Sequence, residues 1–212
     1  MGMKKKILCG IAVLLLMMAA VFGGYWAWKY YWLSPEPDAK EYATIEQRAK
    51  EALNYVRKHD MNERYALFVD YNIPSGTPRL FVWDFRKKRI VARTYVMHGP
   101  GGGSTDKRAR FSNKIGSNCS SLGKFLVTKE HGRVNKRGFR LKGLEKCNSN
   151  AYVRALMIHR SSWVDTHCWM AYIPLHPSSC EGCVTVSSRG LDYLHPLIMR
   201  EKKPLLLWSF SR

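Results

Sequence analysis

Acidic residues are scarce in this 212-residue chain: Asp and Glu total 16 against 35 Lys and Arg, which gives a formal net charge of +19. Three of the basic residues and none of the acidic ones precede residue 29, so the remainder of the chain carries +16. This imbalance excludes a neutral, inert surface and predicts an anionic partner. Apolar residues make up 46%, so a chain with room for one domain and little more can still bury a core.

Charge is absent altogether from Ile7–Trp28, which directly follows the basic run Lys4–Lys6. These 22 residues would span about 33 Å as a helix, against about 30 Å for the core of a bilayer. A cleavable signal has a shorter apolar region, of roughly 7–15 residues. We therefore expect an uncleaved transmembrane helix, with cleavage near Ala19–Gly24 as the alternative.

The orientation of that helix sets the compartment. Basic flanks stay cytoplasmic under the positive-inside rule, so we expect the rest of the chain to be exported. The sequence thus predicts a single-pass inner-membrane protein whose main domain lies in the periplasm or extracytoplasmic space. The excess of cations then points away from nucleic acid and towards cell wall, anionic lipid or acidic peptide, with a solvated basic surface as the plain alternative.

Several motifs that would assign other functions are missing. The segment His98–Ser104 is rich in glycine, but no Gly-Lys-Ser/Thr follows it, which excludes a phosphate-binding loop. Neither His-Glu-x-x-His nor a second Cys-x-x-Cys pair accompanies His159, Cys180 and Cys183, which argues against a zinc hydrolase built on these three residues. No internal repeat is visible, and the sequence gives no indication of the oligomeric state.

Periodicity divides the chain into three parts. Residues 1–33 form the expected transmembrane signal anchor, residues 34–62 a linker and an amphipathic helix, and residues 63–212 a mostly β (α+β) domain with helical additions. The helix is predicted by apolar residues that recur at spacings of three and four between Asp38 and His59. Beyond it the period changes to two, as in strands separated by turns. The predicted strands are Tyr65–Tyr71, Leu80–Phe85, Arg89–Met97, Gly123–Lys129, Ala151–His159 and Leu205–Phe210.

Two residues have the features of a nucleophilic site. His159 ends an apolar run, and Cys183 follows Gly182 ahead of the β-branched stretch Val184–Val186. A thiol needs a neighbouring base or cation to become a thiolate near neutral pH, and a histidine at a strand end can supply it. A glycine before the nucleophile permits a sharp turn and brings backbone N–H groups towards a reacting carbonyl. The plain alternative is a structural histidine and an inert buried cysteine.

The order and spacing of motifs around these residues resemble the signature of the murein L,D-transpeptidase catalytic family, the YkuD-like group. The resemblance covers roughly residues 64–210, nearly the whole exported part. The segments that carry it are Val69–Tyr71, Arg79–Phe81, Met97–Gly99, Phe111–Asn113, Gly116–Ser117, Ser120–Gly123, Leu141–Leu144, Asn150–Tyr152, Arg154–Ala155, Ile158–His159 and Cys180–Cys183.

The resemblance implies a β-sandwich with the cysteine and the histidine on neighbouring strands. It implies a cysteine acyltransferase that acts on peptidoglycan stem peptides and uses no metal and no organic cofactor. Cys183 would be the nucleophile and His159 its base, and the backbone N–H groups of Gly182 and Cys183 would hold the oxyanion. An amine acceptor makes such an enzyme a transpeptidase, water makes it an L,D-carboxypeptidase, and an anchored protein makes it an attachment or release enzyme. The rival outside catalysis is a silent peptidoglycan-binding domain.

The chain departs from the family pattern at three positions. Cys180 replaces the serine of Ser-x-Gly-Cys, Arg160 replaces a small residue after the histidine, and Val184 follows the nucleophile where proline is common. Arg160 either narrows the cleft or holds a substrate carboxylate as a bidentate partner.

Three further side chains are candidates for substrate binding. They are His98, Ser117 and Ser121, for which hydrogen bonding within the surrounding loops is the alternative.

The cysteines offer an independent test of an exported thiol enzyme. Five lie beyond the anchor: Cys119, Cys147, Cys168, Cys180 and Cys183. In an oxidising compartment an odd number leaves one thiol unpaired. If that thiol is Cys183, we predict at least one disulfide among the other four. A Cys180–Cys183 bridge is the rival pairing, but a thiol–disulfide oxidoreductase would need a helix after it, whereas the stretch that follows favours a strand.

Overall fold

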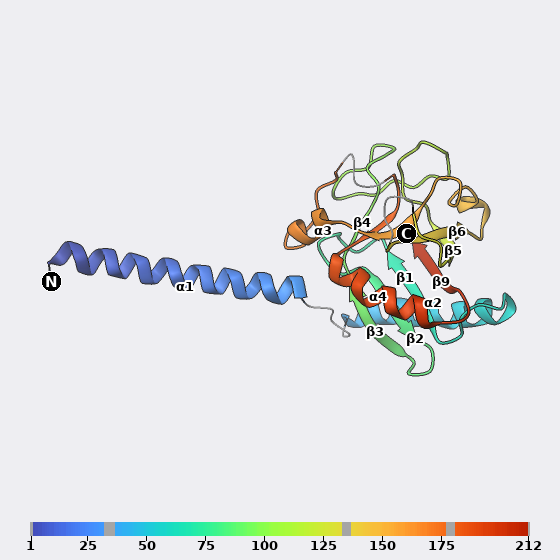
Figure 1. The fold of residues 1–212 in the computed structure, drawn as a ribbon, viewed down its shortest axis with the longest axis horizontal. Helices are drawn as coiled ribbons and strands as arrows, with labels where there is room; N and C mark the ends of the chain where they lie inside the picture. The colour runs from blue at the N-terminus through green and yellow to red at the C-terminus, as the bar shows by residue number, and fades with distance from the viewer. Residues whose placement is uncertain (1, 32–36, 133–136, 177–180, 212) are drawn as a thin grey trace. The chain divides into compact units, whose positions relative to one another are not determined.

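The computed structural model describes residues 2–31, 37–132, 137–176 and 181–211, which form two compact units, Met1–Trp32 and Leu33–Arg212 (Figure 1). The first unit is the helix α1, Met3–Tyr31. Its segment Lys5–Tyr25 has a mean hydropathy of 2.5 and is wholly exposed, so by length and composition it is a candidate membrane span. A signal sequence near an N-terminus has the same properties, so the alternative of cleavage stands.

The amphipathic helix expected between Asp38 and His59 is confirmed as α2, Ala39–Lys58. A capping box fixes its start: the Asp38 carboxylate accepts from the backbone N–H of Glu41 at 2.7 Å, and the Glu41 carboxylate accepts from that of Asp38 at 3.4 Å. The apolar stripe of α2 packs on one face of the sheet and forms the main hydrophobic core with it. Its buried residues are Ile45, Ala49, Ala52 and Val56, and their partners on the sheet include Phe68, Phe81, Leu206 and Trp208.

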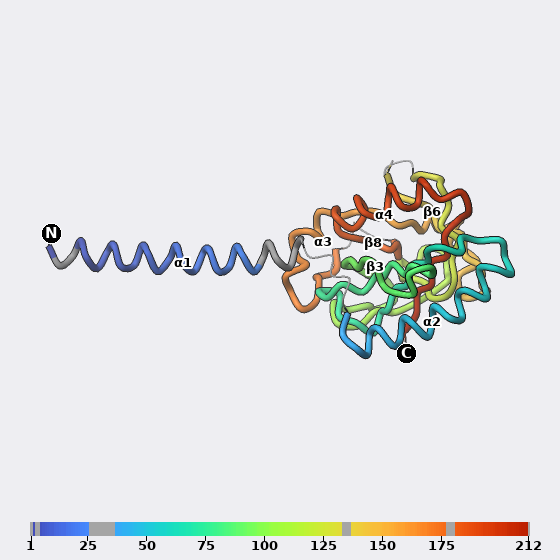
Figure 2. Tube along the Cα trace, turned by 90° about the horizontal axis from the view of Figure 1, so that it is seen from below, coloured from blue at the N-terminus to red at the C-terminus, as the bar shows by residue number. Residues whose placement is uncertain are grey.

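The strands join into one nine-stranded sheet in the order β3-β2-β1-β9-β5-β6-β7-β8-β4 among the residues that the structure describes. Strands β3 and β4 stand at opposite ends of this order although only Tyr95 separates them in sequence. The sheet therefore folds back on itself, which confirms the mostly β sandwich, and α2 and α4 lie on opposite sides of the strands (Figure 2). The strands are β1 Tyr65–Asp70, β2 Leu80–Asp84, β3 Arg89–Thr94, β4 Val96–Met97, β5 Gly123–Val127, β6 Phe139–Gly143, β7 Met157–Arg160, β8 Val184–Val186 and β9 Leu205–Phe210.

The strand predicted at Ala151–His159 is wrong over its first half. Only β7 is extended; the preceding residues form turns, Val153 is 70% exposed, and Ala155 adopts a left-handed φ of 56°. The turns bring the side chain of Arg154 into the interior, where its hydrogen bonds outweigh the β preference of the local sequence.

Three short or unexpected elements complete the domain. They are the 3₁₀ turn Lys146–Asn148 and the helices α3, Ser162–His167, and α4, Ser188–Arg200. Serine caps both helices: Ser161 accepts from the backbone N–H of Trp163, and Ser187 accepts from that of Gly190. Neither helix was among the elements predicted individually.

Candidate active site

The parallel pair β7 and β8 brings the two predicted catalytic residues together. Their register matches His159 with Thr185, and Cys183 precedes Thr185 by two residues. Side chains alternate along strands, so the paired residues His159 and Thr185 share one face, and Cys183 stands directly before β8, two residues from Thr185. His159 is 9% exposed and Cys183 is 8% exposed, so both are largely shielded from solvent.

The hydrogen bonds of the His159 ring assign its tautomer. Nδ1 lies 3.0 Å from the backbone oxygen of Arg160, which can only accept, so Nδ1 carries the proton. In the neutral ring Nε2 is then the acceptor, and the Thr185 hydroxyl lies 3.2 Å from it. Nε2 is therefore directed towards β8, the strand that Cys183 directly precedes.

Gly182 holds the chain in a conformation that other residues rarely adopt. Its φ is 105°, and a Cβ there would lie 2.0 Å from the backbone oxygen of Cys119 and 2.9 Å from Nη2 of Arg154. Gly99 also packs on it, since a Cβ on Gly99 would lie 2.8 Å from the Gly182 Cα. The backbone beside Cys183 is therefore enclosed by two other loops, which gives a physical reason for glycine at both positions.

Arg154 ties these loops to one another. Nη1 donates to the backbone oxygen of Ser112 and to the Ser121 hydroxyl, both at 2.7 Å. Nη2 donates to the backbone oxygens of Cys119 at 2.5 Å and Glu181 at 3.3 Å. Arg154 lies in one of the segments that carry the family resemblance, but the sequence predicts no role for it, because partners 27–42 residues away leave no local signal.

His98, a candidate for substrate binding, lies beneath its loop. It is 1% exposed; Nδ1 accepts from Arg79 Nη2 at 3.0 Å, and Nε2 donates to the Thr105 backbone oxygen at 3.0 Å. Burial, followed by the nearby charge of Arg79, lowers the pKa of His98 to about 4. Burial likewise lowers the pKa of Arg79 to about 10. The pair anchors the glycine-rich loop through a neutral imidazole.

The other candidate residues lie at different depths. Ser121 is buried, and its hydroxyl donates to the Ser112 backbone oxygen at 2.8 Å. Ser117 is half-buried and accepts from the backbone N–H of Cys119 at 3.5 Å. Arg160 is exposed at the end of β7 and forms no ion pair with any residue that the structure describes. Contact of these side chains with substrate stays a prediction.

The structure tests only some of the predictions about the cysteines. Cys180 lies outside the described residues, and so does its pairing with Cys183. No disulfide joins the described cysteines Cys119, Cys147, Cys168 and Cys183 to one another, so of the predicted pairings only those through Cys180 stay open. The stretch after Cys183 is a strand, β8, which confirms the argument against a helix-based redox motif.

Comparison with known proteins identifies a family. The family described as L,D-transpeptidase catalytic domain (YkuD_2) matches residues 37–208. No curated protein matches the chain.

Solved structures similar to the chain include an L,D-transpeptidase (residues 123–326) from Xylanimonas cellulosilytica DSM 15894. It is 16% identical with a TM-score of 0.39, and the match covers 69% of this chain and 60% of that one. Another is the helical cell shape determining protein Pgp2 from Campylobacter jejuni, 12% identical with a TM-score of 0.44, over 79% of this chain and 56% of that one. The chain thus spans less than two thirds of the length of either.

Proposed function

Because the chain belongs to the L,D-transpeptidase catalytic domain family, we propose that it is a cysteine acyltransferase that acts on peptidoglycan stem peptides. The observation that carries the proposal is the pairing of β7 with β8, which sets His159 opposite Thr185, two residues beyond Cys183, with Nε2 bonded to the Thr185 hydroxyl. Membership of the family supports the substrate class, and this arrangement supports Cys183 as the nucleophile and His159 as its base.

The first half-reaction forms a thioester. Nε2 of His159 takes the Cys183 proton, and the carbonyl of Arg160, bonded to Nδ1–H, stabilises the imidazolium. The thiolate sulfur attacks the carbonyl carbon of the third stem residue, and the backbone N–H groups of Gly182 and Cys183 stabilise the oxyanion. As the intermediate collapses, the bond to the terminal D-residue breaks, and the leaving amine takes the proton from Nε2.

The second half-reaction depends on the acceptor. The amine of a second stem peptide gives up a proton to Nε2 and attacks the thioester, which forms a new amide and restores the thiol. Water in that position gives an L,D-carboxypeptidase, and the amine of a wall-linked protein gives attachment. We assign transpeptidation as the main reaction. We also propose that α1 anchors the enzyme in the inner membrane with its domain in the extracytoplasmic space, where peptidoglycan lies.

The proposal is tested by incubating isolated peptidoglycan with the full chain and analysing the muropeptides by mass spectrometry. We expect new crosslinks and released D-residues, both lost in Cys183→Ala. Cys147→Ala is the matched control, because Cys147 is an exposed cysteine outside the site. If Cys183→Ala retains both products, the proposal fails.

A further inference from the structure

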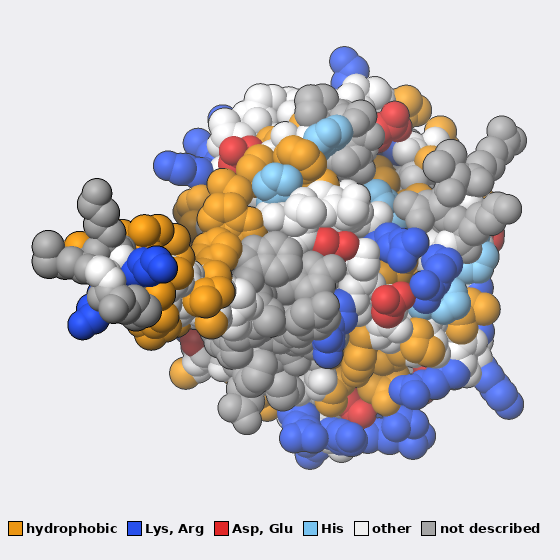
Figure 3. All heavy atoms as spheres, turned by 60° about the vertical axis from the view of Figure 1, so that its left-hand side comes forward, with side chains coloured by type: hydrophobic (Ala, Val, Ile, Leu, Met, Phe, Trp, Pro, Cys, Tyr) orange, Lys and Arg blue, Asp and Glu red, His pale blue; other side chains and the backbone are white. Residues whose placement is uncertain are grey.

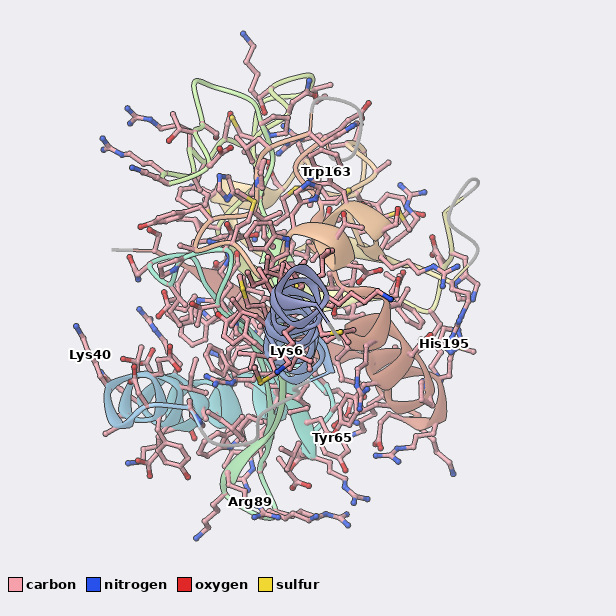
Figure 4. All side chains as sticks on the ribbon, turned by 90° about the vertical axis from the view of Figure 1, so that its left-hand side faces the viewer. Lys6, Lys40, Tyr65, Arg89, Trp163 and His195 are labelled. Carbon is pink, nitrogen blue, oxygen red and sulfur yellow. The ribbon has the colours of Figure 1, made fainter. Side chains whose placement is uncertain are left out.

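A basic groove with a volume of about 500 Å³ lies where α2 ends and β9 begins, apart from the candidate active site. Five of its lining residues are cations, Arg64, Arg86, Arg200, Lys202 and Lys203. Figure 4 places Tyr65, next to Arg64, on the lower side of the domain, with Trp163 near the end of β7 on the upper side. Figure 3 shows Lys and Arg side chains gathered along the lower edge of the face drawn there.

The carboxylates of the basic groove are already engaged. Glu63 pairs with Arg57 at 3.3 Å. Glu201 accepts from the Asn62 side-chain amide at 2.9 Å and pairs with Arg200 at 3.4 Å. Lys203 pairs with Asp60 at 2.6 Å, so two of the five cations of the groove, Arg200 and Lys203, are compensated.

Three of those cations lack an acidic partner within the described part of the chain: Arg64, Arg86 and Lys202. Arg86 and Lys202 are exposed, and Arg64 is half-buried with an Nε that has no hydrogen-bond partner among the described residues. The groove is therefore an anion site by charge, with one buried donor unsatisfied.

One aromatic ring orders two of the arginines. The Arg64 guanidinium lies 5.0 Å from the centre of the Tyr65 ring, and that of Arg200 lies 5.5 Å from it. Arg200 also donates to the Tyr65 hydroxyl at 3.1 Å. Stacked, planar guanidinium groups with fixed N–H directions suit the bidentate binding of phosphate.

We propose that the basic groove binds the phosphate of anionic phospholipid headgroups at the surface of the membrane that α1 would span. Only five residues separate Tyr31 of α1 from Pro37, and such a segment reaches at most about 20 Å. The domain is thereby held near the membrane. The tether joins it ahead of the start of α2 and the groove lies past the end of that helix, about 30 Å away, so the groove meets the headgroups when α2 lies along the surface. There each added cation strengthens binding to anionic lipid about fivefold. The inference rests on the proposed membrane location and is independent of the chemistry at Cys183.

The test uses the full chain in nanodiscs of phosphatidylcholine, with or without one part in three of phosphatidylglycerol, and measures backbone hydrogen exchange. We expect phosphatidylglycerol to slow exchange about fivefold or more around residues 62–64, 85–88 and 200–204. The double variant Arg86→Gln/Lys202→Gln, which alters only exposed side chains, should lose this protection. Lys107→Gln/Arg108→Gln removes two exposed cations elsewhere and should keep it.

Equal exchange in the two kinds of disc, or loss of protection in the control variant as well, overturns the proposal. Inorganic phosphate added to phosphatidylcholine discs separates the sources: equal protection by millimolar phosphate assigns a free-phosphate site and overturns the lipid assignment. Muropeptide formation by the double variant is measured in parallel. Loss of lipid protection with retained activity separates this inference from the proposed catalysis.

Discussion

At the scale of single residues, the site depends on a guanidinium that does not react. Arg154 reaches four acceptors on three segments, and one of them, Cys119, contacts Gly182 beside Cys183. We expect Arg154→Lys to slow acylation of Cys183 on the order of 100-fold, because an ammonium cannot span the four acceptors and a small displacement of the nucleophile is costly. The rate of covalent labelling of Cys183 is measured at a saturating concentration of a carbapenem, and the thermal midpoint of unfolding is measured in parallel. A slower rate with an unchanged midpoint shows a positioning role, whereas a lowered midpoint shows unfolding.

Arg140→Lys is the matched control, since Arg140 also donates to a backbone oxygen, that of Tyr152, but lies outside the loops around Cys183. It should label at the wild-type rate. If Cys183 of the Arg154→Lys protein is labelled as fast as in wild type, the hydrogen bonds of Arg154 have no effect on the rate of acylation.

His98 makes the stability of the domain depend on pH. Its pKa is about 4 in the folded protein, below the ordinary value of about 6.5 that holds when the chain is unfolded. The unfolded state therefore takes up the proton first, so the stabilisation is complete above about pH 6.5 and declines as pH falls towards 4. The free energy of unfolding is measured by chemical denaturation over this pH range. We expect its decline to be about 3 kcal/mol smaller in His98→Gln, which keeps a neutral side chain.

Gln47→Ala, which alters an exposed side chain that does not titrate, provides the comparison and should leave the decline as it is. Identical pH profiles for wild type and His98→Gln would contradict the role given to the Arg79–His98 pair.

At the scale of elements, α2 contributes a core stripe to the sheet. Ile45 is fully buried against it, so Ile45→Ala should lower the free energy of unfolding by about 2–5 kcal/mol. Gln47, on the exposed side of the same helix, should tolerate alanine within about 0.5 kcal/mol. Equal losses for the two variants, measured by denaturant titration, would mean that α2 does not dock as described.

Elements with a strong local period could be predicted from the sequence, whereas those shaped by distant partners could not. α2 and β9 follow their apolar patterns, and Leu205–Phe210 is a strand as predicted. The run Arg89–Met97 is instead divided at Tyr95, because β3 and β4 belong to opposite ends of the folded-back sheet. α4 contains Gly190 and Pro196, which obscure a helix, and glycine is needed there because a Cβ would lie 2.2 Å from the Thr94 hydroxyl oxygen.

The candidate site, too, could be predicted from the sequence only in part. His159, Gly182 and Cys183 are recognisable from residue type and order, but their proximity follows from a pairing of β7 with β8 that the sequence does not display. The role of Arg154 could not be predicted for the same reason, since its hydrogen bonds connect segments far apart in the chain.

At the scale of the whole molecule, the claim is that an exported domain carries one thiol primed by one imidazole. The most direct measurement is intact-protein mass spectrometry of the full chain treated with a carbapenem, a β-lactam class that acylates cysteines of this family. We predict one adduct that peptide mapping places on Cys183, absent in Cys183→Ala, strongly slowed in His159→Gln and unchanged in Cys147→Ala. An adduct on another cysteine, or equal labelling of the His159→Gln protein, would contradict the account.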